Sequence, residues 1–304
     1  MARKAHNRKS ISLRNLKPGN LRRQWRKAGF RQRAAIVAKI VPAVVAAVAL
    51  IVGLTCFVSW RVEIGMARMA QNQLQSQYDF NPGNIIDDGL FFNGNAMSEQ
   101  QVQAILDQQG ARCSGAKCLK TMTFDTQSQP ANEYCQAYDG GGKETAAAII
   151  YKAGKACGIS QKVLLTVLQK EQNLLTATDS SDFQFKSAMG LNCPDDADCS
   201  PQYAGFFRQM YGAAKRYQYY AHHEDQYGYH AGRLNYVRYN PNSSCGGSNV
   251  YIENKATALL YIYTPYQPNE AALAAGSGEG DACSAYGNRN FSIIYDSMFG
   301  NPRG

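Results

Sequence analysis

A continuous apolar run near the N-terminus constrains this chain more than any other feature. From Ile40 to Trp60 there are 21 residues without a charged side chain, close to the roughly 20 residues that a helix needs to cross a bilayer. A cleaved signal peptide has a shorter apolar stretch, of about 7 to 15 residues, that ends at a small-residue site. We therefore predict an uncleaved signal anchor that contacts the lipid bilayer through residues 36–60. A cleaved signal peptide is the alternative.

The distribution of charge predicts how this anchor is oriented. Residues 1–35 carry twelve Lys or Arg and no Asp or Glu, and the first acidic residue is Glu63. The positive-inside rule keeps such a basic tail in the cytoplasm, so we predict a single-pass cell-membrane protein whose C-terminal part is extracytoplasmic. After Arg61 the chain has 18 Lys or Arg against 23 Asp or Glu, a net charge of −5. The overall charge of +9 therefore does not indicate a nucleic-acid partner.

The cysteines agree with export. One, Cys56, lies in the apolar run, and the other eight follow it: Cys113, Cys118, Cys135, Cys157, Cys193, Cys199, Cys245 and Cys283. An even number in an exported domain predicts four disulfides. The short spacings favour Cys113 with Cys118 and Cys193 with Cys199, and sequence neighbourhood then pairs Cys135 with Cys157 and Cys245 with Cys283. A zinc site at "CPDDADC" is the alternative, but no histidine lies near it, so we predict neither a metal nor a cofactor.

Helical patterns dominate the exported part. Apolar side chains recur at helical spacing in 143–158, 163–176, 205–223 and 254–264, and only 234–240 and 249–254 look like a small hairpin. The expected fold class is mainly α. We predict five segments: a cytoplasmic tail (1–35), the anchor (36–60), a turn-rich stalk (61–90), a small helical segment clipped by a disulfide (91–129) and a main domain (130–304).

Glu171 is the candidate catalytic residue. In "VLLTVLQKEQNLLT" it falls on the same helix face as Leu164, Val167 and Leu168, because residues three, four and seven positions apart share one side of a helix. A carboxylate on a packed face must be paired, be hydrogen-bonded, line a cleft or retain its proton. A cleft position describes a catalytic acid, whereas an ion pair with Arg208 or Arg233 would make Glu171 structural.

The residues after Glu171 resemble a known family. A helix that ends in a glutamate, followed by a loop and by "KSAMGLN" with its Gly-Leu turn and amide, is similar to the lysozyme-like fold of lytic transglycosylases. The later "ATALLYIYTPY" looks like the alanine-rich helix of that family, which ends in a cleft tyrosine. The resemblance covers roughly residues 140–300 and implies a lysozyme-like domain with Glu171 as the general acid and base. It also implies a sugar-binding set of Ser187, Gly190, Leu191, Asn192 and Tyr263, with Tyr261 as the second choice for the tyrosine.

The resemblance also predicts the reaction. A glycosidic oxygen must be protonated as its bond breaks, and most glycosidases add a second carboxylate; the candidates for one, in polar loops, are Asp179, Asp182, Asp195 and Asp196. Lytic transglycosylases need no second carboxylate, because the 2-acetamido group and 6-hydroxyl of the substrate complete the reaction. We therefore predict a peptidoglycan-active protein that cleaves the MurNAc–GlcNAc bond.

A binding module is the second hypothesis. Gln172 follows Glu171 where the family has serine, Thr264 follows Tyr263 where it has asparagine, and the methionine–glutamine pair after Gly-Leu is missing. These departures favour a lysozyme-like cleft that holds glycan without cutting it, as an adhesin would. The chain as a whole also resembles a group of actinobacterial membrane-anchored or secreted proteins, some of them labelled haemagglutinin-like.

Overall fold

The computed structural model describes residues 22, 25–26, 28–194 and 198–304. These residues form two compact units, Met1–Glu63 and Ile64–Gly304, here called unit 1 and unit 2. Most of the predicted basic tail, together with Asp195 and Asp196, lies outside the described residues.

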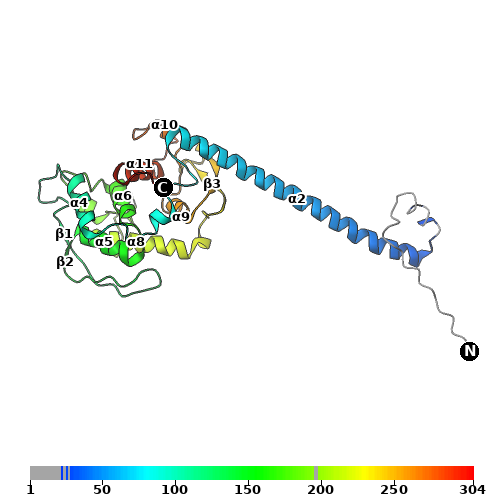
Figure 1. Cartoon of the computed structure of the whole chain (residues 1–304), viewed down its shortest axis with the longest axis horizontal. Coiled ribbons are helices and arrows are strands. Elements are labelled where there is room, and N and C mark those ends of the chain that lie inside the picture. Colours follow the sequence, from blue (N-terminus) through cyan, green and yellow to red (C-terminus); the bar gives the residue numbers. More distant parts are fainter. Residues whose placement is uncertain (1–21, 23–24, 27, 195–197) are drawn as a thin grey trace, which may run out of the picture. The chain divides into compact units, whose positions relative to one another are not determined.

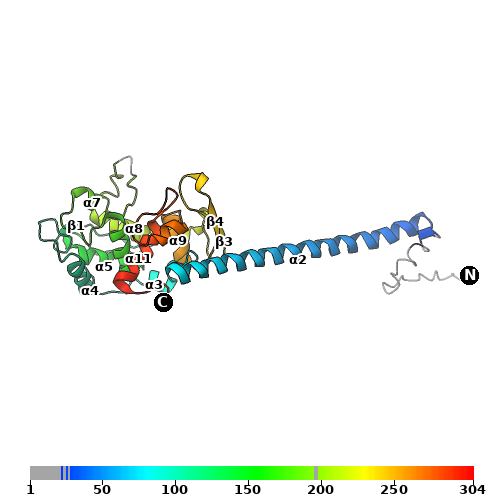
Figure 2. The ribbon, with the colours of Figure 1, turned by 90° about the horizontal axis from the view of Figure 1, so that it is seen from above.

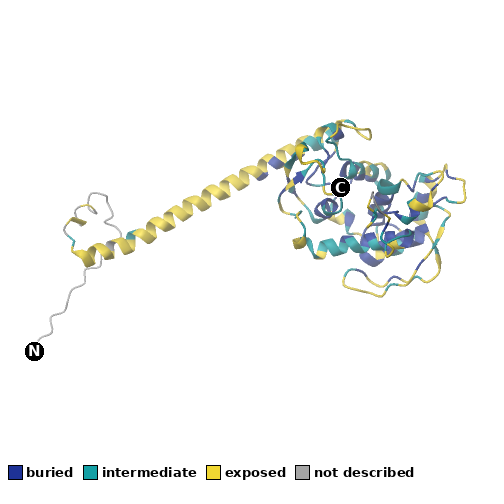
Figure 3. Cartoon of the chain, turned by 180° about the vertical axis from the view of Figure 1, so that it is seen from behind, coloured by how far each residue is buried: buried dark blue, intermediate teal, exposed yellow. Residues whose placement is uncertain are grey.

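Unit 1 contains most of helix α2 (Phe30–Tyr78), a 49-residue helix that passes through Pro42. An 18-residue window of α2 has a mean hydropathy of 2.7, and none of that window is buried. Figure 3 shows this stretch as exposed, and its surface includes Leu50, Ile51, Leu54 and Phe57. The helix is therefore long and apolar enough to cross a membrane. An anchor and a signal sequence both have these properties, and the predicted orientation stays a prediction.

The last turns of α2 belong to unit 2, which differs from the predicted stalk over residues 61–90. Ile64, Ala67 and Gln71 are buried and recur at helical spacing. The Gln71 side chain accepts a hydrogen bond from the Tyr251 N–H (2.8 Å) and donates one to the Tyr251 carbonyl (3.2 Å). Apolar side chains beyond the helix, such as Ile85, are also buried. The physical reason for the difference is that the turn formers of this segment connect buried side chains, which are part of unit 2.

Unit 2 is mainly helical, as predicted, with two small antiparallel sheets (Figures 1 and 2). After α2 its elements are α3 (Asp88–Phe91), α4 (Glu99–Gln109), β1 (Thr123–Asp125), β2 (Lys143–Thr145), α5 (Ala146–Cys157), α6 (Gln161–Gln172), α7 (Asp182–Lys186), α8 (Phe206–His222), η2 (Glu224–Gln226), β3 (Arg233–Arg238), η3 (Ser243–Cys245), β4 (Gly247–Ile252), α9 (Lys255–Tyr263), α10 (Glu270–Ala274) and α11 (Gly287–Phe299). The predicted boundary between residues 129 and 130 falls inside this unit.

The core lies where α5 packs on α4 and α8, and where α6 packs on α11. Ile149, Leu164, Met210 and Leu259 are completely buried there. Each helix places its apolar stripe inward, which is how an amphipathic helix removes apolar surface from water. A lysozyme-like arrangement of these helices stays a prediction.

One of the two sheets was predicted and the other was not. Strands β3 and β4 pair antiparallel, with Leu234 opposite Tyr251 and Val237 opposite Ser248, so the predicted hairpin is confirmed. Strands β1 and β2 also pair antiparallel, but each has only three residues. Three residues are too few to show an alternating apolar pattern, which is why the sequence did not reveal this sheet.

All four disulfides have the predicted partners: Cys113–Cys118, Cys135–Cys157, Cys193–Cys199 and Cys245–Cys283. The free cysteine among the described residues is Cys56, in α2. Oxidised cysteines agree with a unit that folds outside the cytoplasm.

The lengths of the loops that these disulfides close lead to a prediction. Cys245–Cys283 spans 38 positions and Cys193–Cys199 spans 6, and in the chain-entropy account the longer loop stabilises by about 2 kcal/mol more. We expect the double variant Cys245→Ala/Cys283→Ala to lose about 2 kcal/mol more free energy of unfolding than Cys193→Ala/Cys199→Ala. Urea unfolding of the full chain in detergent, followed by near-UV circular dichroism of its tyrosines, measures the difference. Equal losses would contradict the entropic explanation.

Candidate functional site

Glu171 lies in the last turn of α6. Asn173 ends the helix in a left-handed conformation (φ 54°), so the Glu171 carboxylate lies where the chain leaves the helix. Leu164, Val167 and Leu168 on the same face are buried, whereas the Glu171 side chain keeps 24% of its exposure. The packed face of α6 therefore leads from the core to a partly exposed carboxylate.

Lys170 is the ionic partner of this carboxylate. Its ammonium contacts Oε1 of Glu171, and its side chain is only 10% exposed. The Lys170 Nζ also lies 5.7 Å from the centre of the Tyr263 ring, a distance at which a cation is attracted to an aromatic face. Glu171 therefore has an ion-pair partner, as the structural alternative requires, but this partner is the adjacent Lys170 and not Arg208 or Arg233.

The turn that contains Ser187 and Gly190 passes directly over Glu171. The Ser187 hydroxyl donates to the Phe183 carbonyl (2.8 Å), and the Gly190 N–H donates to the Ser187 carbonyl (2.8 Å). Gly190 has φ +69°, and a Cβ built on it would lie 3.0 Å from Oε2 of Glu171. A residue without a side chain is thus required here for two reasons, its backbone conformation and the closeness of the carboxylate.

Gln209 of α8, which the sequence did not single out, holds this turn in place. Its Oε1 accepts hydrogen bonds from the N–H groups of Met189 and Leu191 (both 3.0 Å), and its Nε2 donates to the Leu191 carbonyl (2.8 Å) and the Tyr203 carbonyl (2.9 Å). Gln209 is completely buried. A buried amide that uses both its oxygen and its nitrogen fixes a backbone segment strongly, since each lost bond would leave a buried polar group without a partner. The sequence feature that could have identified Gln209 is its position on the apolar face of the helix predicted over residues 205–223.

Tyr263 completes the surroundings of Glu171. Its hydroxyl donates to the Met189 carbonyl, and its ring stacks on Tyr217 with the centroids 5.2 Å apart. Burial, with the Glu171 charge as the next cause, raises the pKa values of Tyr263 and Tyr217 well above the ordinary value. Both phenols therefore stay protonated at neutral pH, and they are neighbours of the carboxylate.

The other predicted binding residues lie farther from this centre. Leu191 is buried. Asn192 is exposed with φ 50°, and its carbonyl accepts a hydrogen bond from the Ser200 N–H. Tyr261 is a core residue whose hydroxyl donates to the Pro82 carbonyl (2.9 Å), which corrects its assignment as a cleft tyrosine. The physical reason is that Tyr261 and Tyr263 are two positions apart on one helix and so point in different directions.

None of the described loop aspartates contacts Glu171. Asp179 is exposed, and Asp182 is 88% exposed and pairs with Lys117 at 2.8 Å. Within residues 28–194 and 198–304, no group of three or more His, Cys, Asp and Glu side chains is arranged to hold a metal ion.

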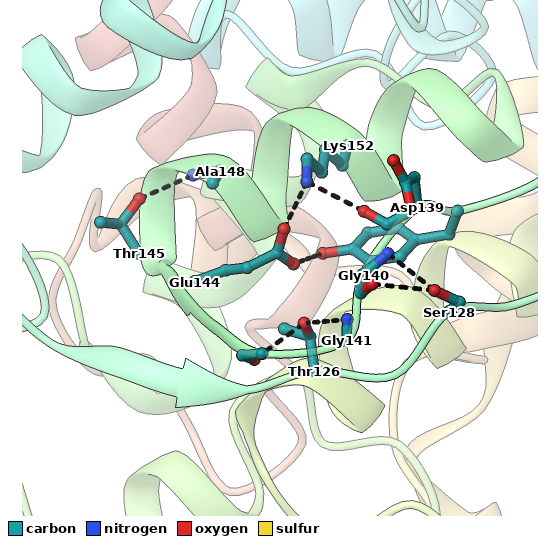
Figure 4. A network of polar contacts seen from close by, with 11 residues as sticks. Thr126, Ser128, Asp139, Gly140, Gly141, Glu144, Thr145, Ala148 and Lys152 are labelled. Atoms are coloured by element: carbon teal, nitrogen blue, oxygen red, sulfur yellow. Dashed lines mark hydrogen bonds and ion pairs between the residues drawn. The ribbon is translucent and has the colours of Figure 1, made fainter.

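Glu144 of β2 is a second shielded carboxylate, which the sequence also did not single out (Figure 4). Lys152 contacts its Oε1, and the Tyr138 hydroxyl donates to its Oε2 at 2.6 Å. Lys152 also donates to the Asp139 carbonyl (2.9 Å). Burial raises the pKa of Glu144, but the hydrogen bonds from Lys152, Tyr138 and Thr126 outweigh burial, and the net pKa is lower than the ordinary value.

Glu144 and Glu171 differ in how many of their carboxylate oxygens are bonded within the protein. Both oxygens of Glu144 are bonded within the protein, so this residue ties β2 to α5. Glu171 has Oε1 on Lys170, and among the described residues no side chain donates to its Oε2, which faces Gly190. Of the two, the Glu171 side chain is the more exposed (24% against 14%) and has an oxygen without a side-chain donor, which makes it the candidate site.

Comparison with known proteins gives one match. The sequence model of the family described as "LasA, N-terminal domain" matches residues 84–304. Searches of curated proteins and of solved structures found no match. The matched range contains Glu171, Gly190, Gln209 and Tyr263 and begins after α2 ends.

The lowered pKa of Glu144 leads to a pH prediction. A carboxyl whose pKa is lower in the folded state stabilises the protein above its unfolded pKa, and this contribution is lost as the pH falls through the folded pKa. We expect Glu144→Gln to lower the free energy of unfolding by about 1 to 3 kcal/mol at pH 7, and the difference from wild type to shrink as the pH falls below the ordinary value of 4.5. Urea unfolding at several pH values measures this difference. Glu253→Gln, at an exposed glutamate, should show no such trend, and a difference that stays constant for Glu144→Gln would refute the assignment.

Gly190 and Gly276 form a matched pair for testing the contact with Glu171. Both have positive φ (69° and 58°), but a Cβ at Gly276 meets nothing within 4 Å. We expect each Gly→Ala variant to lose about 1 kcal/mol of stability from its backbone conformation. Only Gly190→Ala should also change glycan binding or cleavage, because its methyl group presses on the carboxylate. If both variants behave alike in a binding assay, the turn does not belong to the site.

Proposed function

The chain belongs to the LasA N-terminal domain family. We propose that its unit 2 is exported and that it binds and cleaves the glycan strands of peptidoglycan. LasA names a family of peptidoglycan-active proteases, which supports a role at the cell wall. The family description names a domain and no reaction. The proposal of glycosidic cleavage therefore rests on the site of this chain.

One observation carries the proposal: a single glutamate at the end of a buried helix is 24% exposed and lies against a glycine turn, and among the described residues no side chain donates to its Oε2. The turn is held by Gln209 and Tyr263, so the carboxylate has a fixed position before any substrate arrives. A general acid must lie within hydrogen-bond reach of the atom that it protonates. Positioning by buried hydrogen bonds meets this requirement better than a flexible loop does.

In the proposed reaction the Glu171 carboxyl first donates a proton to the glycosidic oxygen between MurNAc and GlcNAc, and the bond to the MurNAc anomeric carbon breaks. The carboxylate that results then takes the proton of the MurNAc 6-hydroxyl as this oxygen closes on the anomeric carbon. Atoms and protons balance, and the product is a 1,6-anhydro sugar. No second carboxylate is needed, which agrees with the positions of Asp179 and Asp182.

A glycan-holding module without cleavage is the second candidate. The observation that favours it is the ion pair of Lys170 with Oε1 of Glu171. In this candidate the ion pair is structural, and the carboxylate only accepts hydrogen bonds from a ligand. The residues Gln172 and Thr264, which depart from the transglycosylase pattern, favour the same candidate.

Digestion of purified peptidoglycan by the full-length chain in detergent, with its disulfides formed, tests the proposal. Wild type, Glu171→Gln and the exposed control Glu253→Gln are compared, and the released muropeptides are identified by mass spectrometry. We expect anhydro-muropeptides from wild type and from the control. Glu171→Gln should reduce their release by a factor of about 10² or more, the usual contribution of a general acid.

Each other result has a definite meaning. Reducing-end sugars in place of anhydro sugars would replace transglycosylation with hydrolysis. Cleaved stem or bridge peptides would mean a peptidase and would contradict the glycosidic proposal. An absence of products, with equal peptidoglycan binding by all three proteins, would establish the non-cleaving module.

A further inference from the structure

A groove lies along the more open side of α8. The inner, buried side of this helix carries Gln209 and Tyr217. The outer side carries Arg208, Lys215 and Arg216, and these side chains line a cavity of about 760 Å³. We refer to this cavity as the α8 groove. Glu171 is not among the residues that line it.

The α8 groove has a one-sided charge. Its lining contains three cations and no Asp or Glu. An adjoining hollow of about 320 Å³ shares Arg208 with it and contains Asp125, but Lys143 pairs with this aspartate at 3.2 Å. Glu133, next to the lining residue Tyr134, lies 4.0 Å from His222. Asp125 therefore has a cationic neighbour of its own, and Glu133 has an imidazole beside it.

The three cations contact neutral groups, so these contacts do not neutralise their charge. Arg208 donates to the Pro201 carbonyl (3.0 Å), and Arg216 donates to the Tyr203 hydroxyl (3.1 Å) and lies 5.7 Å from the Tyr219 ring centre. Lys215 lies 5.9 Å from the ring centre of Tyr134. Within the described residues none of the three forms an ion pair. A guanidinium has five N–H donors, so each arginine keeps donors for a ligand.

The shape of the groove indicates an extended ligand. Its lining runs along α8 from Arg208 to Tyr219, a rise of about 16 Å on a helix. Four tyrosines line it, and the flat faces of tyrosine pack against apolar ring faces while the hydroxyls hydrogen-bond. Three glutamines in the lining add amide donors and acceptors. Rings, hydroxyls and negative charge in one extended molecule are the properties of an acidic saccharide.

We propose that the α8 groove binds an anionic saccharide chain, with its rings against the tyrosines and its carboxylates or phosphates on Arg208, Lys215 and Arg216. Arginine recognises both anions through paired hydrogen bonds. The site is separate from Glu171 and does not depend on the proposed cleavage. Two sources share this chemistry: the lactyl carboxylates of a glycan strand that contains muramic acid, and a phosphodiester-linked wall polymer.

Binding to the full-length chain in detergent, with three defined probes, tests the proposal. The probes are peptide-free GlcNAc–MurNAc oligomers, poly(N-acetylglucosamine 1-phosphate) and the neutral tetramer of GlcNAc. The groove variant is Arg208→Gln/Lys215→Gln/Arg216→Gln. Its matched control, Arg112→Gln/Lys155→Gln/Arg233→Gln, removes the same charge from exposed positions. The single variant Arg208→Gln, at an exposed residue, keeps the test valid if the triple variant does not fold.

We expect at least one anionic probe to bind more tightly than the neutral tetramer and to bind more weakly as salt is added. The groove variant should lose about tenfold or more in affinity and Arg208→Gln about threefold, because charge-assisted hydrogen bonds are the strong ones. The control should lose less than about twofold, since exposed charges that do not touch a ligand are screened. The anionic probe that binds identifies the source.

Three results would overturn the proposal: no binding of either anionic probe, equal binding of the neutral tetramer, or an equal loss in the control variant. The binding assay measures the effect of Arg208, Lys215 and Arg216, whereas the digestion assay measures the effect of Glu171. The groove and the candidate catalytic site can therefore fail independently.

Discussion

The carboxamide of Gln209 connects the helical core of unit 2 to everything that surrounds Glu171. It lies on the buried face of α8, yet four of its hydrogen bonds go to the backbone of the turn around Met189 and Leu191 and to the Tyr203 carbonyl. A turn of irregular backbone close to a core must have its N–H and C=O groups satisfied. Because one side chain does this for both sides of the turn, Gly190 can lie within van der Waals distance of Glu171. The position of the carboxylate therefore depends on the packing of α8 as much as on α6.

The parts of the structure that the sequence predicted are those with a repeating physical signal. Apolar spacing located α5, α6, α8 and α9. The short spacings favoured Cys113–Cys118 and Cys193–Cys199, and neighbourhood in the chain suggested the other two disulfides without excluding other pairings. Single side chains that bond to distant backbone have no such signal. Gln209 looks like any polar residue of a helix until the turn that it holds is known, and Glu144 lies in a strand too short to have a pattern. The turn formers between residues 61 and 90 predict a stalk, whereas the burial of Ile64 and Ala67 becomes visible only in the folded chain.

The two faces of α8 have different physical characters, and this bears on what unit 2 does. The inner face is apolar apart from Gln209, and it orders a carboxylate. The outer face is basic and aromatic, and it lies over a groove long enough for several sugar rings. Unit 2 is acidic overall, with 18 Lys or Arg and 22 Asp or Glu and so a net charge of −4. A surface with three cations and no lining carboxylate is therefore a local exception. A basic groove of this kind attracts a negatively charged polymer and raises its concentration near the domain.

The disulfides show where the helical core is insufficient. None of them joins two core helices. Cys113–Cys118 closes the loop after α4, Cys135–Cys157 fastens the loop before β2 to the end of α5, and Cys245–Cys283 joins the β3–β4 connection to the segment before α11. Cys193–Cys199 lies directly after the turn that covers Glu171. That turn is thus held from below by Gln209, from the side by Tyr263 and along the chain by a covalent bond. Long loops lose much conformational entropy when they are ordered, and covalent closure reduces the entropy that the unfolded chain has to lose. A domain with short helices and long loops can in this way hold one carboxylate in a defined place.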